Sequence, residues 1–384
     1  MKNVSRAILI LLPLLSACAG GTNSTLPPLQ SAAAGQSASV LASSLAPVTR
    51  EPVEELRLPQ AVASTGDLLY VGNTGSNTIT VYRNDAAGNV APMYVIGGPR
   101  TGIDHPGQLA QDAQGNLYVA NGAYSAAGQS SSAPAILVFA HGANGDVAPI
   151  RTLAGSLTGI HNIAAMTVDR ATGKIFVDDY VYESDGYLVD VRMLRFPPGA
   201  TGNTAPYARS AAGLFPALEL ASDSTGQRLI EAHSTNAANN YGFGVDTIVK
   251  QFPNGGAAVV PPYGVIDAFQ TTGVADDPTT KTYLVSAGSI YRFAEGTTGV
   301  GPTEGNVPSF TPLAESTITS DTCGSQLAIG NSRDIFVTHG TQTGCPADAI
   351  YVYAPDAAGN AHPLRILAGA ATGLSHPYGI FVGT

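Results

Sequence analysis

The chain contains no tryptophan, and charged residues make up only 12% of its 384 residues, about half of the ~25% found in typical soluble domains. The absence of tryptophan argues against WD40 blades, whose signature includes Trp-Asp. The shortage of charge argues against coiled coils and helical bundles, which are rich in Glu and Lys. Glycine and proline are instead abundant, with 44 and 26 residues, and they favour a fold with many turns.

Basic residues are also few. Lys and Arg total 18 against 28 Asp and Glu, which gives a net charge of −10 at pH 7. Phosphate binding requires a basic patch, and the sequence offers none, so no nucleic acid is expected as a partner. Hydrophobic residues, at 44%, are sufficient for a large core.

Residues 1–17 are typical of a signal peptide, because Lys2 and Arg6 precede a short apolar stretch. That stretch is too short to cross a bilayer, which takes ~20 apolar residues. The four residues that end at Cys18, LSAC, resemble the lipobox of bacterial lipoproteins. The resemblance implies that Cys18 is lipidated and becomes the mature N-terminus; the alternative is an ordinary signal peptide with a chance cysteine.

Residues 18–50 are rich in Ala, Ser, Gly and Pro, which predicts a flexible tether between the anchor and a folded domain. Ala19 follows the cysteine, and the rule for Gram-negative lipoproteins then implies attachment to the outer membrane. We expect an exported protein that contacts the membrane through its lipid and faces the periplasm or the cell surface.

Residues 51–384 contain a repeat of about fifty residues, which is typical of a propeller. Its most regular part is an apolar strand such as LYVGN or LYVAN, followed by an alternating strand. The anchors of the six modules are Tyr70, Tyr118, Phe176, Ile230, Tyr283 and Phe336.

Each module offers four strand candidates, a to d, with the anchor in strand b and a Gly-Asn turn before strand d. The turns from a to b and from c to d are expected to be tight. The sequence therefore predicts an all-β β-propeller of six four-stranded blades over residues 51–384. A seventh blade completed by Ala46–Thr49 is the alternative. His376–Val382 is an additional strand a. Either this segment or Pro59–Ala63 is expected to be strand a of the first blade.

The segment from His105 to Asn121, HPGQLAQDAQGNLYVAN, resembles the repeat of NHL-type propellers. The segment from Leu69 to Tyr82, LYVGNTGSNTITVY, is similar to the YVTN repeats of surface-layer propellers. The resemblance extends over the modules from about residue 56 and implies the propeller fold. It says little about function, because propellers carry many unrelated activities.

Strand alternation places the d-to-a and b-to-c connections on one face, called here the loop face. Long b-to-c connections carry aromatic residues, and such loops on a rigid scaffold often bind ligands. We therefore expect a binding or interaction module whose ligand is a protein, a glycan or a small molecule. The candidate binding residues are His105, His161, His233, Glu231, His339, His376, Tyr180 and Tyr241.

His105, His161 and His376 open their modules in the same repeat register, just before strand a. Since strand a lines the central channel, their imidazoles could meet at its mouth and bind zinc or copper. Some NHL-type lyases are similar, which implies a metal-dependent lyase or lactonase, with zinc or calcium, as the alternative function. The other interpretation is that these histidines only hydrogen-bond the repeat, with no cofactor.

Asp112, Asp169, Asp223 and Asp277 lie near a-to-b turns, where Asp commonly caps the turn. Cys323 and Cys345 are predicted to form a disulfide, because both fall on the loop face of the sixth module and an exported compartment is oxidising.

Overall fold

The computed structural model describes residues 67–122, 132–182, 188–209, 217–222, 228–234, 246–253, 264–269, 271–277, 282–286, 289–294, 299–300, 316–318, 324–340 and 348–383. These residues are all-β apart from one short 3-10 turn, η1 (Ala370–Thr372). The parts of the chain that the structure describes include no helix that is long and apolar enough to cross a membrane.

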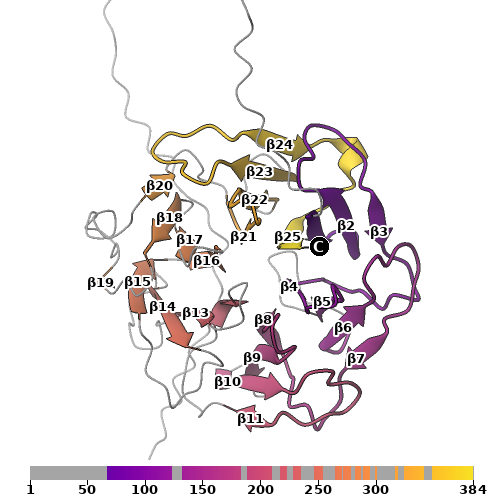
Figure 1. Cartoon of the computed structure of the whole chain (residues 1–384). Coiled ribbons are helices and arrows are strands. Elements are labelled where there is room, and N and C mark those ends of the chain that lie inside the picture. The colour runs from indigo at the N-terminus through magenta and orange to yellow at the C-terminus, as the bar shows by residue number, and fades with distance from the viewer. Residues whose placement is uncertain are drawn as a thin grey trace, which may run out of the picture. The chain divides into compact units, whose positions relative to one another are not determined.

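Over the described residues, the strands form six sheets (Figure 1), numbered here in chain order. The first three sheets contain β25 (Pro377–Gly383), β1 (Leu68–Asn73), β2 (Thr78–Arg83) and β3 (Tyr94–Ile96); β4 (Leu109–Gln111), β5 (Leu117–Asn121), β6 (Ala135–Phe139) and β7 (Arg151–Leu153); and β8 (Ile163–Val168), β9 (Ile175–Tyr182), β10 (Leu188–Phe196) and β11 (Ala208–Arg209).

The other three sheets follow the same order, with one additional strand in the fourth. They contain β12 (Ala217–Ser222), β13 (Arg228–Ser234), β14 (Asp246–Pro253), β15 (Gly264–Phe269) and β19 (Gly299–Val300); β16 (Thr271–Asp276), β17 (Thr282–Ser286), β18 (Ser289–Phe293) and β20 (Ser316–Ile318); and β21 (Leu327–Ile329), β22 (Ile335–His339), β23 (Ala349–Tyr353) and β24 (Arg365–Ala368).

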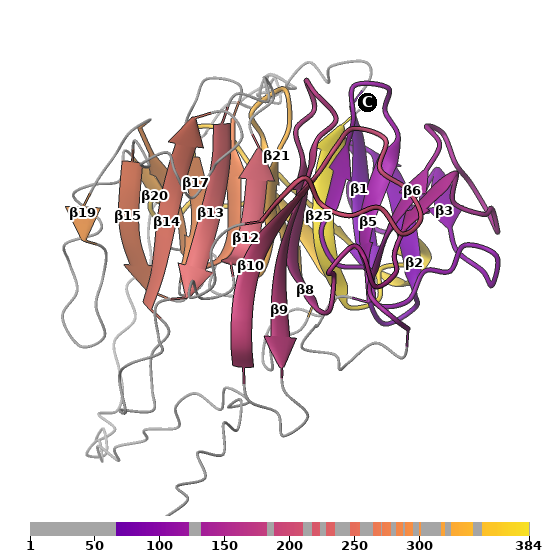
Figure 2. The same ribbon diagram turned by 90° about the horizontal axis from the view of Figure 1, so that it is seen from below.

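The strand predictions around the six anchors are confirmed, since every expected strand b and strand c is present. The C-terminal strand β25 pairs antiparallel with β1, with Tyr70 opposite Phe381, and Figure 2 shows the yellow β25 beside the indigo β1. The first sheet therefore takes its innermost strand from the end of the chain. Pro59–Ala63, the other candidate for this strand, and Ala46–Thr49, which would complete a seventh blade, lie outside the described residues.

The first strands of the six sheets contact one another in the order β25, β4, β8, β12, β16, β21 and again β25. Apolar side chains from neighbouring sheets pack together between them. One such cluster joins Tyr70 and Ile79 of the first sheet to Val119 and Phe139 of the second. These all-β, mainly four-stranded antiparallel sheets are consistent with a propeller-like fold.

The c-to-d connections differ from the prediction of tight turns. They span residues 84–93, 140–150, 197–207 and 354–364, and each crosses to the outer strand of the preceding sheet. There a glycine forms a parallel bridge with an apolar residue of that strand, an arrangement called here the clasp. The bridged pairs are Gly88–Leu367, Gly145–Ile96, Gly202–Leu153 and Gly359–Ile318.

The clasp also explains the fifth strand of the fourth sheet. β19 belongs to the c-to-d connection of the fifth sheet, and Gly299 pairs in parallel with Ile266 of β15. The clasp therefore recurs at five of the six junctions between sheets, within the residues that the structure describes. Because a bridged edge strand has fewer unpaired backbone groups, the clasp also protects the outer edge from association.

Candidate functional site

The loop face carries an unusual backbone conformation at four polar residues. In the described part of the chain, five non-glycine residues have positive φ, and four of them, Asn77, His105, Asp348 and His376, lie on this face. Left-handed conformations are uncommon for residues with a side chain, and they cost energy that the surroundings must supply. Two of the histidines that the sequence singled out, His105 and His376, therefore lie in strained segments.

The His105 corner joins the first and second sheets. Asn77 has φ 54° and His105 has φ 46°, and the Asn77 Oδ1 accepts the His105 N–H at 2.9 Å. The Asp104 Oδ1 lies 2.8 Å from the His105 Nδ1 and accepts the Asn77 Nδ2 at 3.3 Å. The Asp104 carboxylate therefore orients the imidazole of His105. The hydrogen bonds of Asn77 to Asp104 and His105 join the loop of the first sheet to that of the second.

The His376 corner repeats this arrangement between the sixth and first sheets. The Asp348 Oδ1, just before β23, accepts the N–H of His376 at 2.7 Å. The His376 carbonyl accepts the Thr74 hydroxyl at 3.0 Å, and the Ser375 N–H donates to the Asn73 Oδ1 at 3.0 Å. In both corners, an Asn or Asp before strand c of one sheet holds a histidine before strand a of the next.

The His161 corner differs, and it corrects the prediction that the three histidines share one repeat register. Thr101 and Thr372 cap equivalent turns four residues before their histidines, whereas Thr158 caps its turn three residues before His161. His161 is therefore one position early.

Asp179 of β9 holds the His161 corner in place. Its Oδ1 accepts the N–H groups of His161 at 2.6 Å and of Asn162 at 2.8 Å. Its Oδ2 lies 3.0 Å from the His161 Nδ1. The carboxylate is fully buried while the imidazole side chain is 47% exposed, so this corner presents an oriented ring to solvent.

Burial raises the pKa of Asp179 above its ordinary value of 3.8, although the hydrogen bonds from His161 and Asn162 act in the opposite direction. A carboxyl whose pKa is raised on folding stabilises the fold below its unfolded value and loses that contribution as pH rises through the folded value. The charged form of Asp179 is thus the less favourable one for the fold.

Asp179→Asn is expected to gain stability relative to the parent protein as pH rises from about 4 to 7, by about 1 kcal/mol. The amide oxygen still accepts the two backbone N–H groups, and the buried charge is gone. Urea unfolding at the two pH values measures the difference. The same exchange at exposed Asp356 controls for the loss of one negative charge, and a pH-independent difference at Asp179 would contradict this assignment.

The three histidines are not gathered into one metal site. Among the described residues, no group of three His, Cys, Asp or Glu side chains lies close enough to hold a metal ion. His105 and His161 are instead each paired with a carboxylate of their own. The described residues thus give no support to a channel-mouth metal site.

His339 is only 1% exposed, and its ring stacks on Tyr351 with centroids 4.0 Å apart, which places it in the packing rather than on the loop face. Glu231, His233 and Tyr180 lie in β13 and β9, but their side chains are outside what the structure describes. The remaining candidates outside the described residues are Tyr241, Cys18, Cys323 and Cys345.

The turn-capping interpretation is confirmed for two carboxylates. The Asp112 Oδ1 accepts the N–H groups of Gln114 and Asn116 at 3.0 and 2.9 Å, and the Asp169 Oδ1 accepts that of Ala171 at 2.9 Å. Asp277 forms an ion pair with Arg333 at 3.0 Å, and the turn that follows it lies outside the described residues. Asp223 lies outside the described residues.

Sequence reasoning missed Asn77, Asp104 and Asp348, which hold the histidine corners, and it did not pair Asp179 with His161. A signal was present in part, because Asn77 and Asp348 each stand immediately before a strand c, where Asn and Asp tolerate a left-handed turn.

Comparison with known proteins gives no assignment. No family model and no curated protein matches the chain. Among solved structures, the chain is similar to a protein of unknown function from Bacteroides caccae, with 9% sequence identity and a TM-score of 0.47, over 82% of this chain and 98% of that one.

Proposed function

We propose that the chain is a six-bladed β-propeller of NHL or YVTN type that is exported, held at a bacterial membrane by lipid on Cys18, and binds a partner on its loop face. The cyclic contacts of the first strands and the five clasps support the closed ring. The observation that carries the binding function is the gathering of left-handed polar residues on one face, because strained backbone is concentrated at functional sites.

The face that carries the a-to-b turns differs from the loop face in a way that supports binding at the loop face. At the a-to-b turns, the carboxylates of Asp112 and Asp169 accept N–H groups of their own turns. On the loop face, in contrast, hydrogen bonds fix the backbone of His161 and His376 while their side chains remain exposed. A scaffold that orients exposed polar rings is suited to recognition.

Photo-cross-linking from the two faces tests this proposal. A photoreactive residue at exposed Ser76 or His161 reports on the loop face, and one at exposed His362 reports on a c-to-d connection. In the full-length protein in its native cells, we expect a discrete cross-linked species from the first two positions and none from the third. Equal cross-linking from all three positions, or none from Ser76 and His161, would count against a loop-face partner.

The membrane anchor has its own test. Cys18→Ala removes the thiol to which the lipid would be attached, so the protein is expected to leave the membrane fraction almost completely. Cell fractionation with labelling by a radioactive fatty acid measures the change. Retention in the membrane fraction without label would reject lipidation as the anchor.

A further inference from the structure

The six sheets share a cross-strand row that starts at the anchor residue of strand b. Each row continues with the residue opposite it in strand c and then in strand d. The rows are Tyr70–Val81–Tyr94, Tyr118–Val138–Arg151, Phe176–Arg195–Ala208, Ile230–Gln251–Gly264, Tyr283–Arg292–Ser316 and Phe336–Val352–Arg365. Four of these rows contain one arginine, and the first and fourth contain none.

In the second and sixth rows, the arginine covers the aromatic ring of its own row. The Arg151 Cζ lies 5.6 Å from the ring centroid of Tyr118, and its Nη2 donates to the Tyr118 hydroxyl at 2.6 Å. The Arg365 Cζ lies 5.6 Å from the Phe336 centroid, and its Nη2 pairs with Asp334 at 2.9 Å. Both contacts are within the range of cation–π attraction.

Arg365 of the sixth row and Arg292 of the fifth row also reach the next sheet. The Arg365 Nη2 donates to the carbonyl of Asn84 at 2.7 Å, and the Arg292 Nη1 donates to the carbonyl of Pro355 at 3.0 Å. Asn84 and Pro355 each follow their own strand-c row residue by three positions. For the first row, the equivalent carbonyl in the next sheet belongs to His141.

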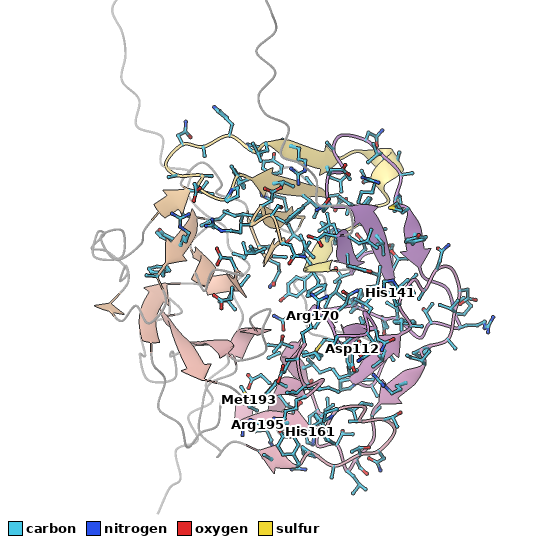
Figure 3. The ribbon with its side chains drawn as sticks, in the orientation of Figure 1. Asp112, His141, His161, Arg170, Met193 and Arg195 are labelled. Carbon is cyan, nitrogen blue, oxygen red and sulfur yellow. The ribbon has the colours of Figure 1, made fainter. Side chains whose placement is uncertain are left out.

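The first row lines a small half-open pocket between the first and second sheets, at the end of the sheets opposite the loop face. Figure 3 labels His141 at this boundary. Gly115 allows the ring of His141 to approach, because a Cβ there would lie 2.6 Å from its Nδ1. The lining residues are Leu68, Tyr70, Val81, Tyr94, Ile96, Gly115, Leu117 and Ala140–Ala143.

We propose that this pocket binds the guanidinium group of an arginine side chain presented by a peptide or protein partner. In the second and sixth rows, the strand-d position is an arginine whose guanidinium group covers the aromatic ring of the same row. In the first row, the strand-d position is Tyr94, so no guanidinium group of the protein covers Tyr70 from that position. Tyr70 and Tyr94 supply two aromatic rings for the cation. The net charge of −10 favours the approach of a cationic ligand.

One difference between the first row and the sixth row determines how tightly the pocket is expected to bind arginine. Asp334 stands two residues before Phe336, whereas Leu68 stands two residues before Tyr70. The residues that line the pocket, all in the described part of the chain, include no Asp or Glu. Binding therefore depends on cation–π attraction and hydrogen bonds, without an ion pair. A single arginine is expected to bind with a Kd on the order of millimolar.

Titration of the full-length protein with N-acetyl-L-arginine amide, followed by NMR, tests the proposal. We expect it to bind at least tenfold more tightly than N-acetyl-L-lysine amide, because a guanidinium group is planar, is weakly hydrated and donates hydrogen bonds in fixed directions. Tyr94→Arg reproduces the second and sixth rows, fills the pocket from within and is expected to weaken arginine binding at least tenfold. Met93→Arg, at the exposed neighbouring residue, is the matched control and is expected to leave binding unchanged.

A second variant keeps the test decisive if Tyr94→Arg folds poorly. Tyr94→Leu introduces no charge, removes one of the two aromatic rings and is expected to weaken arginine binding about fivefold. The proposal is overturned if arginine amide does not bind, or if p-cresol binds the same site more tightly than arginine amide does. It is also overturned if a folded Tyr94 variant binds arginine amide as tightly as the parent protein does.

Discussion

Removal of Pro377–Thr384 is expected to abolish cooperative unfolding of the protein. The deletion takes away β25, so β1 loses one of its two antiparallel partners. It also removes Ile380, Phe381 and Val382 from the clusters on both sides of the first sheet. Burial of each large apolar side chain stabilises by roughly 1.5–3 kcal/mol, and whole domains are stable by only about 5–15 kcal/mol. Circular dichroism during heating measures the loss.

Two controls make this result specific. Deletion of Thr384 alone is expected to leave the unfolding midpoint unchanged. A synthetic peptide of residues 374–384, added in excess to the truncated protein, is expected to restore a cooperative transition, because a ligand that binds only the folded state stabilises it. A truncated protein that unfolds at the parent midpoint would show that β25 does not complete the first sheet.

Gly369→Ala is expected to destabilise the fold by about 3 kcal/mol. Gly369 has φ 120° and ψ 166°, a region that only glycine occupies readily. A Cβ there would lie 2.5 Å from the Oδ1 of Asn89, the oxygen that accepts the Ala371 N–H at 2.7 Å. The substitution therefore strains the backbone and opens the clasp between the sixth and first sheets. Urea unfolding measures the change.

Gly373→Ala is the matched control, four residues further along the chain. Gly373 has φ 70° and ψ 10°, and the nearest atom to its added Cβ is the Thr80 Cγ2 at 3.7 Å. Only left-handed strain is then expected, at about 1 kcal/mol. Equal losses in the two variants would contradict a role for the contact between Gly369 and Asn89.

The strands were predictable because their signal is local. Apolar residues such as Val119 and Ile136 recur in short runs bounded by Gly, Asn and Pro, and this pattern alone specifies a buried strand. The clasp was not predictable in the same way. Gly145 beside Asn144 indicates a tight turn, and nothing local shows that Gly145 pairs with Ile96 of another sheet.

The candidate site was predictable only in its histidines. Their partners, Asn77 for His105 and Asp348 for His376, lie 28 residues away in the chain, and the distance is set by the fold rather than by a motif. The one-residue shift of His161 relative to His105 and His376 was not predicted, for a related reason. A one-residue change in a loop alters no periodic pattern, yet it transfers the hydrogen bond to Asp179.

The pairing of β25 with β1 also determines when the protein can fold. Contacts at this junction join residues 302 positions apart, as between Thr74 and His376. During synthesis, the ribosome delivers β1 long before β25, and domains that close through such distant contacts fold slowly. The first sheet is therefore translated first but acquires its innermost strand last, and the nascent chain must carry an unpaired β1 edge until residue 383 has emerged.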